Sequence, residues 1–550
     1  MLKNFIGFLL LLFCANNFFA QTAKNTKRSV QNPQALVQRA LEKIGGIEAL
    51  EKAGGIAWTG EGEYDLSVRM QGTRADQPDI VPLQEKFGFV YASQKTAYET
   101  HARVNPDADE WMRYIHDGEG RMQILNRLEK WAFWDTNPGN EAQRKRYSRI
   151  VPHLLLNEAL KNKNDLRYAG ELNFQNRSFQ KVSFSTKDSE NLSLLFDKKS
   201  GDYAGLEYLV DYPLWGDTFV RWIFSDYKEV ENFGLYPTRY RIFLGDKILK
   251  AVALKNISTD TATAEIFAAP KDIEIPEPPK VEPIKQTAEQ PTERPLPRVS
   301  KLAENVHLVV NVRGGFHVLV IEFKDFVAVV DTPAGYHEFQ QIPAIDWAGE
   351  KNSRAVGDRL LETIKKTIPN KPVRYVVLTH YHSDHTGGIR PFIEAGAKIV
   401  TSPETASVIR NSFGRKFSFE SPENPLFPKT EKFEIVRNEY AISDGEMEAK
   451  IINIGKNPHV EGMLLVYLPK PKLLYQADLF EPINMKRFPN PARVPVMKWF
   501  VAWLDKSGLK PEMIYAIHGA AKVSEEQIAK IRNSNTKNTS QTETEQKGNL

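Results

Sequence analysis

The sequence predicts two domains of different fold class: an α+β domain rich in antiparallel sheet, followed by an α/β domain. Its 550 residues exceed one compact core, because domains usually contain about 100–200 residues. Eight prolines from Pro270 to Pro297 stand among Glu, Lys and Gln without apolar periodicity, which is typical of an extended spacer. Alternating strand patterns precede this spacer, and buried strands followed by helices come after it.

Composition excludes several classes of protein. The hydrophobic fraction of 41% and the charged fraction of 26% are ordinary for a folded chain. The net charge is only +4 and no dense Lys/Arg run occurs, so we expect no nucleic-acid partner. The single cysteine, Cys14, excludes a disulfide framework, a Cys-based zinc finger and an iron–sulfur cluster. Any bound metal must therefore be held by His, Asp or Glu.

Residues 1–20 have the form of a secretory signal peptide. Lys3 precedes an apolar run over residues 5–13, and cleavage is expected after Ala20. The run is shorter than the roughly 20 residues that a membrane-spanning helix needs, and no later stretch is long enough either. Cys14 raises the alternative of a lipoprotein anchor, but bulky Phe13 stands where such sites need a small residue. We expect a periplasmic or secreted protein without a transmembrane anchor.

The predicted accessory domain covers residues 30–270. A helix is expected over residues 33–44, ending at a Gly-Gly pair, with a short second helix before the next Gly-Gly pair. Apolar and polar residues alternate over 236–242, residues 244–247 form a turn signal, and the next strand follows. The predicted strands are 180–185, 192–196, 218–227, 236–242 and 248–257. The helix-then-meander order resembles the half-barrel of periplasmic lipoprotein carriers.

Six of the nine tryptophans lie in this first half of the chain. We interpret them as filling the concave face of a curved sheet. The alternative is a surface that binds a hydrophobic or lipid-like ligand. His101, His116 and His153 are scattered without the spacing of metal ligands, so no catalytic site is predicted in this domain.

The chemistry-bearing motif begins where a buried strand over residues 373–379 ends. The next residues are His380-Tyr381-His382-Ser383-Asp384-His385-Thr386-Gly387-Gly388. Three histidines and an aspartate in six residues would be costly to bury without partners. Strand alternation directs His380 and His382 the same way, and the glycines let the backbone pass close to a site. Mixed imidazole and carboxylate ligation suits zinc best, with iron and manganese as alternatives.

This motif resembles the signature of the metallo-β-lactamase-fold hydrolases, H-x-H-x-D-H followed by a distant His, Asp and His. The later positions are His459 before a strand over 463–468, Asp478 after a strand over 473–477, and His518 after a strand over 513–516. Asp331, which ends a strand over 327–330, resembles the aspartate that supports the site in this family. The resemblance covers residues 301–533 and implies an αββα sandwich. Helices are expected over 354–367, 389–394 and 525–531.

The resemblance assigns a role to each position. It implies that His380, His382 and His459 bind one metal, that Asp384, His385 and His518 bind a second, and that Asp478 bridges them. Two zinc ions per chain would share a hydroxide that attacks an ester, thioester, lactone or related bond of a small-molecule substrate. Asp384 and Asp478 are then the catalytic carboxylates, and Asp331 orients a histidine from outside the ligand set.

Several residues bear on the substrate. Asp478 stands where antibiotic-hydrolysing β-lactamases of this fold have Cys or lack the bridging aspartate, whereas Ala477 departs from the Gly usual in glyoxalases and lactonases. Tyr381, His337 and His317 are candidate substrate contacts. His317 belongs to the segment 313–317, which we expect to be a strand.

Three alternatives to an exported dinuclear zinc hydrolase remain open. One is a β-lactamase-like amide hydrolase, and another is an envelope binding protein that retains metal without significant catalysis. A redox member of the fold with two irons is the third, although no Cys pair exists to bind the iron of its usual partner domain. The proline-rich spacer, residues 271–300, leads us to expect that the C-terminal domain folds and binds metal on its own. Residues 534–550 are expected to be a disordered tail.

Overall fold

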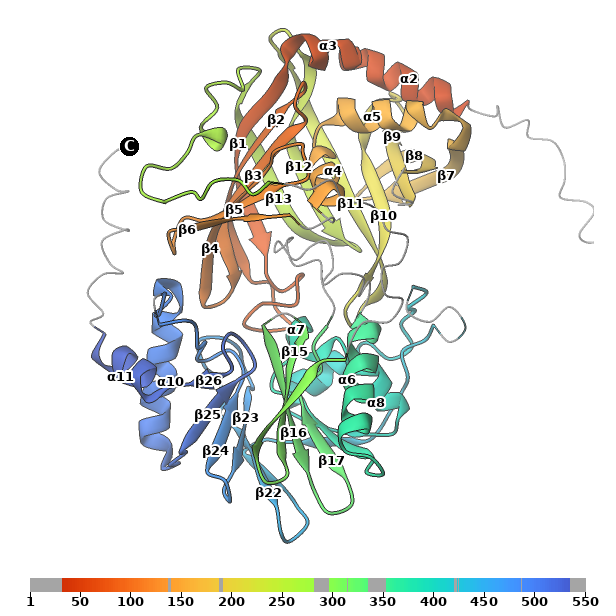
Figure 1. Ribbon diagram of the computed structural model, residues 1–550. Coiled ribbons are helices and arrows are strands. Elements are labelled where there is room, and N and C mark those ends of the chain that lie inside the picture. The colour runs from red at the N-terminus through yellow and green to blue at the C-terminus, as the bar shows by residue number, and fades with distance from the viewer. Residues whose placement is uncertain are drawn as a thin grey trace, which may run out of the picture.

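The computed structural model divides into two parts that contact each other (Figure 1). It describes residues 32–136, 140–186, 191–280, 296–313, 315–334, 353–419, 423, 425–485 and 487–534. The predicted signal peptide, most of the spacer, the loop with His337 and nearly all of the predicted tail lie outside these ranges. In the described ranges, no helix is long and apolar enough to cross a membrane.

The N-terminal part is built on one 13-stranded sheet in which every neighbouring pair is antiparallel. The order is a meander whose first and last strands pair, because β1 lies between β2 and β13. The strands are β1 (Gly55–Asp65), β2 (Ile80–Val90), β3 (Lys95–Asn105), β4 (Ala108–His116), β5 (Met122–Asn126), β6 (Trp131–Asp135), β7 (Arg167–Phe174), β8 (Arg177–Ser185), β9 (Asn191–Asp197), β10 (Tyr203–Tyr212), β11 (Gly216–Val230), β12 (Gly234–Leu244) and β13 (Lys247–Ser258).

Among the described residues, four helices pack on this sheet: α2 (Pro33–Lys43), α3 (Gly46–Ala53), α4 (Asn140–Ser148) and α5 (Pro152–Lys161). The side chain of Asn32 caps α2 by accepting from the first free backbone N–H groups of the helix. Leu36 and Val37 of α2 share one apolar core with Leu155 and Leu156 of α5 and with the sheet. The predicted antiparallel, sheet-rich α+β domain is therefore present, with the two expected helices at its start.

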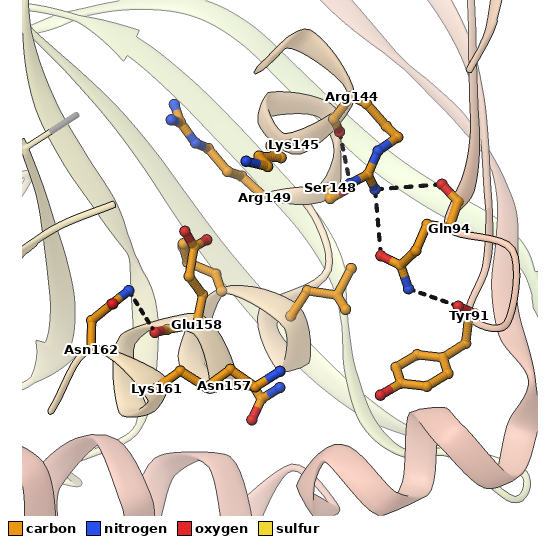
Figure 2. A pocket seen from close by; sticks show the side chains of 12 residues that line it. Tyr91, Gln94, Arg144, Lys145, Ser148, Arg149, Asn157, Glu158, Lys161 and Asn162 are labelled. Carbon is orange, nitrogen blue, oxygen red and sulfur yellow. Dashed lines mark hydrogen bonds between the residues drawn. The ribbon is translucent and has the colours of Figure 1, made fainter. Parts of the chain in front are cut away.

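The N-terminal part has a pocket beside α4 and α5 (Figure 2). Most of its lining residues carry charged or amide side chains, and Leu154, Leu155 and Tyr91 are its large apolar or aromatic ones. The other lining residues are Gln94, Arg144, Lys145, Ser148, Arg149, Asn157, Glu158, Lys161 and Asn162. The charged groups of Arg144, Lys145, Arg149, Glu158 and Lys161 are not what a lipid-like ligand requires, so this pocket adds no support for such a ligand. Among the tryptophans, Trp58 is buried and stacks on Phe87, as a core residue does.

The C-terminal part contains two sheets. The first runs in the order β14 (Arg298–Ala303), β15 (Val306–Arg313), β16 (Phe316–Glu322), β17 (Val327–Val330), β18 (Val373–Val377), β19 (Lys398–Thr401) and β20 (Phe433–Ile435). The second runs in the order β21 (Glu439–Ser443), β22 (Glu448–Asn453), β23 (Leu464–Leu468), β24 (Leu473–Gln476), β25 (Met513–Ala516) and β26 (Lys522–Val523).

Side chains alternate between the two faces of the first sheet, so one face contacts a layer of helices and the other contacts the second sheet. In β17, Val327 and Val329 join the core that contains Leu360 of α6 (Ser353–Thr367), whereas Ala328 and Val330 join the core of the second sheet. That second core also holds one face of α10 (Val494–Ser507) and Ile531 of α11 (Glu525–Asn533). The layers are therefore helix, sheet, sheet and helix, the αββα sandwich that the resemblance implies.

One local expectation was wrong. Residues 313–317 do not form a single strand, because β15 ends at Arg313 and β16 begins at Phe316. Gly315 between them has φ 71°, a left-handed conformation that suits glycine and turns the chain. Arg313 and Phe316 pair with each other, so these two residues lie at the turn end of a hairpin.

Hairpin ends of the N-terminal sheet lie against the C-terminal part. Asp217 accepts hydrogen bonds from Ser418, and Glu129 forms an ion pair with Arg487 at 3.1 Å. Figure 1 shows the short helix α7 (Ser383–Thr386) at this junction. The start of the spacer also lies on the N-terminal sheet, because Trp134 donates to the Pro276 carbonyl at 2.8 Å. The two parts form an extensive contact beside the sequence motif.

Candidate metal centre

Strand ends bring the sequence motif and its distant partners together. His380 and His382 follow β18, Asp478 follows β24, and His518 follows β25. Asp384 and His385 lie in α7, which begins directly after His382. His459 lies between β22 and β23. All seven predicted ligands converge, and they form two groups: His380, His382, His459 and Asp478, and then Asp384, His385 and His518.

In the first group, potential ligand atoms face one another at short range. The Nε2 atom of His459 lies 3.0 Å from Nδ1 of His382 and 3.3 Å from Nε2 of His380. It also lies 3.0 Å from Oδ2 of Asp478. Nitrogens that each bind one tetrahedral zinc at about 2.0–2.1 Å lie roughly 3.3 Å apart, so this spacing fits a shared ion.

The second group has the same character. Nε2 of His518 lies 3.4 Å from Nε2 of His385, which in turn lies 3.7 Å from Oδ2 of Asp384. The other carboxylate oxygen of Asp478, Oδ1, lies 2.9 Å from the His518 nitrogen and 3.2 Å from the His385 nitrogen. Asp478 therefore directs one oxygen to each group, as a carboxylate that bridges two metals must.

The donor set fits two divalent cations with a preference for nitrogen and oxygen ligands. His380, His382, His385 and His459 are fully buried, and Asp478 is 5% exposed. Oδ1 of Asp478 is buried, and none of the described groups gives it a well-oriented hydrogen bond. Burying that much polarity with unfilled bonding capacity is costly unless cations complete it. Five imidazoles and two carboxylates suit zinc best among the common metals.

The protonation of the first group also suits metal binding. Burial lowers the pKa of His380 well below its usual value and that of His382 to about 3, so both rings are neutral and keep a lone pair. Burial also acts to lower the pKa of His459, but the carboxylates of Asp107 and Asp478 outweigh it and raise the value to about 9. A cation bound here would displace the proton that these carboxylates hold on His459.

Asp331 occupies the supporting position that the sequence indicates. Its buried carboxylate accepts from the backbone N–H of Thr379 at 2.7 Å and from the Thr379 hydroxyl at 2.8 Å. Oδ2 also lies 2.9 Å from Nδ1 of His385, which leaves Nε2 of that ring for a metal. The backbone of Asp331 has φ 65°, a conformation in which Asp is among the better-tolerated residues.

Gly388 allows close backbone packing beneath this site. Its N–H donates to the Thr332 carbonyl at 2.9 Å, and a Cβ at this position would lie 2.5 Å from the Pro333 carbonyl oxygen. We expect Gly388→Ala to lower the free energy of unfolding by about 1–3 kcal/mol, because backbone must move to admit the methyl group. Chemical denaturation of the metal-free protein measures this change. An unchanged free energy would show that the Pro333 segment yields without cost.

The candidate substrate contacts behave differently. The Tyr381 hydroxyl donates to the Gly72 carbonyl and is buried. His317 has Nε2 2.9 Å from the Gly519 carbonyl and Nδ1 3.4 Å from the Asn311 N–H, so both ring nitrogens are engaged within the protein. Both side chains are thus engaged within the protein, and their role as substrate contacts stays a prediction. His337 lies outside the described residues.

Sequence reasoning missed the contribution of the N-terminal part. Oδ1 of Asp107 lies 2.7 Å from Nδ1 of His459, although the two residues are 352 positions apart. Gln71 donates to Oδ1 of Asp384 at 2.7 Å. Neither residue belongs to a recognisable motif, so only a contact between the two parts of the chain could identify them.

Comparison with known proteins places this site in a class. Residues 317–518 match the model of the metallo-beta-lactamase superfamily, and this region is a domain of that superfamily. All seven ligand positions lie within the match. The membership supports a metal-dependent hydrolase.

Individual relatives are distant. The metallo-beta-lactamase type 2 of Bacillus cereus is 27% identical over 140 residues, which is 26% of this chain and 48% of that protein. The chain thus spans about half the length of this curated relative. Among solved structures, the metallo-beta-lactamase from Pontibacter korlensis is 19% identical with a TM-score of 0.30, covering 43% of this chain and 100% of its own. FIM-1 from Pseudomonas aeruginosa, solved in a mono-zinc form, is 18% identical with a TM-score of 0.31, covering 44% and 96%.

Proposed function

We propose that the protein is an exported dinuclear zinc hydrolase that cleaves an ester, thioester, lactone or related bond in a small molecule. The observation that carries the proposal is the position of Asp478, whose two carboxylate oxygens each face one group of buried histidines. Export rests on the apolar segment at residues 5–13 and its expected cleavage after Ala20.

Some residues of the site would bind the metals, and Asp384 would also accept a proton. Two zinc ions in such a site supply an acidified water and polarise the oxygen of the scissile bond. Asp384 is placed to accept a proton at Oδ2, because Gln71 already donates to its Oδ1. His380, His382 and His459 lie where no solvent reaches them and hold their positions during turnover.

The substrate approaches from the side of the second group. The side chains of Asp384 and His518 are 15% and 22% exposed, whereas those of His385 and His459 are completely buried. The scissile bond must therefore enter past these two residues. Gln71 of the N-terminal part donates to Asp384, so both parts of the chain contribute residues on this side.

Metal removal tests the proposal. We expect the zinc-loaded protein to hydrolyse at least one member of a panel of ester, thioester, lactone, phosphoester, sulfate-ester and β-lactam substrates. A chelator should abolish this turnover and added zinc should restore it, because the attacking water depends on the metals. The matched control is His307→Gln, because His307 pairs with Glu322 outside the site. Its colorimetric rates should fall with chelator and recover with zinc as those of the wild type do. Full turnover in a metal-free preparation would contradict the proposal.

A β-lactam is the second candidate substrate. The relative from Bacillus cereus is named a metallo-beta-lactamase, which favours this class. Asp478 favours the ester and lactone classes, because antibiotic-hydrolysing members of the resembled family have Cys or no bridging aspartate there. The same substrate panel distinguishes the two substrate classes. If the β-lactam is hydrolysed faster than every ester and lactone, the β-lactam becomes the preferred candidate substrate.

A further inference from the structure

A hairpin of the N-terminal sheet inserts its tip beside the first group of ligands. The turn between β3 and β4 consists of Pro106 and Asp107, and the Asp107 side chain is 5% exposed. Its Oδ1 lies 2.7 Å from Nδ1 of His459. An ionised carboxylate only accepts hydrogen bonds, so Nδ1 must keep its hydrogen, and Nε2, which lies toward His380 and His382, is the nitrogen left to give up its proton and bind a cation.

Arg493 fixes this carboxylate in turn. Its guanidinium lies 2.9 Å from Oδ1 of Asp107, and it also donates to the backbone carbonyl of Asp478. Arg493 is 6% exposed, so the Asp107–Arg493 pair is largely removed from solvent. Breaking a buried pair of this kind is costly, because each charge loses its partner if the other moves. Asp107 therefore connects His459 to the residue that bridges the two groups.

The loop between β1 and β2 acts on the other ligands. The Gly72 carbonyl lies 2.9 Å from Nε2 of His382. A carbonyl also only accepts, so Nε2 of His382 carries the hydrogen and Nδ1 keeps the lone pair. That Nδ1 is the atom 3.0 Å from Nε2 of His459. His382 and His459 thus use opposite ring nitrogens, and an acceptor on the N-terminal part sets each choice.

We propose that the N-terminal domain is a structural part of the metal centre, in which Asp107 is a positioning residue for His459 and the Gly72 carbonyl positions His382. The inference rests on the proposed function, because it concerns the residues that would hold the first metal. The N-terminal domain selects the ring nitrogen that each of these two ligands presents, and it orients Asp384 through Gln71. The affinity for the first metal then depends on contact between the two domains.

Zinc affinity of the full chain tests the inference. Competition with a chromophoric chelator yields a dissociation constant for each metal. We expect Asp107→Ala to weaken the first site about 10- to 100-fold and to leave the second near its original value, because lost partners of metal-binding histidines have this effect. The absorption spectrum of the cobalt-substituted protein should change in the same variant, which a purely structural role would not cause.

Two further variants make the result decisive. Asp109→Ala lies two positions along the same hairpin, where its carboxylate is 45% exposed and paired with His101, and both affinities should stay unchanged. Asp107→Asn keeps the shape but removes the charge that faces Arg493 and His459, so its first-site affinity should fall between those of wild type and Asp107→Ala. If Asp107→Ala does not fold, the first-site zinc affinity of Asp107→Asn tests the inference in its place.

The outcomes separate this inference from the proposed function. Two metals bound with unchanged affinities and an unchanged cobalt spectrum in the Asp107 variants would overturn the inference and leave the hydrolase proposal standing. A wild-type chain that binds no zinc would overturn both.

Discussion

Asp478→Asn is expected to abolish stable binding of at least one metal and to reduce turnover by at least 10²–10³-fold, roughly the cost of losing one strong electrostatic contact at a reacting centre. The carboxylate faces Nε2 of His459 through Oδ2 and Nε2 of His518 through Oδ1. An amide carries no negative charge and offers only one good acceptor, so it cannot serve both groups. Elemental analysis and steady-state rates measure the two effects.

The matched control for this variant is Asp505→Asn. Asp505 lies on α10 of the same domain, half-exposed and paired with Arg532, so neither metal content nor rate should change. Full metal content and wild-type turnover in Asp478→Asn would show that the bridging assignment is mistaken.

Asp331→Ala is expected to lower the free energy of unfolding of the metal-free protein by about 2–6 kcal/mol, or about 1–3 for each of two buried donors left without an acceptor. These donors are the Thr379 backbone N–H and Nδ1 of His385. The Thr379 hydroxyl still has a hydrogen-bond partner in this variant, Nδ1 of His380 at 3.1 Å, so it contributes little to the lost free energy. Denaturation in the presence of chelator isolates this effect from metal binding.

The same variant should also weaken the second metal, because His385 would no longer be held in one tautomer. Asp325→Asn is the control, because Asp325 is an exposed residue in the turn before β17, the strand that Asp331 follows. This control should change neither stability nor metal binding. If Asp331→Ala unfolds with wild-type free energy and binds both metals normally, Asp331 is not the support for this site.

Local patterns predicted individual strands of the C-terminal domain, and the family resemblance implied their αββα arrangement. Val327 to Val330 is apolar throughout since both faces are covered, one by α6 and one by the second sheet. The cluster at residues 380–385 was visible in the sequence because three histidines and an aspartate follow a buried strand. His459, Asp478 and His518 were indicated by their order in the family's signature, and His459 lies in a loop.

The contribution of the N-terminal domain could not be predicted from the sequence. Asp107 follows a proline in a two-residue hairpin turn, a setting in which aspartate is common for purely local reasons. Gly72 acts through its backbone carbonyl, which has no side-chain signal at all. The proline-rich spacer predicted an independent C-terminal domain, whereas the contacts of Gln71 and Asp107 come from across that spacer.

The central claim is that Asp478 joins two metal sites, and anomalous X-ray diffraction from crystals of the zinc-soaked protein tests it most directly. We predict two zinc peaks roughly 3.5–4 Å apart, one on each side of the Asp478 carboxylate. The first peak should lie among His380, His382 and His459, and the second among Asp384, His385 and His518. No peak beside Asp478, or zinc bound only elsewhere on the chain, would contradict it.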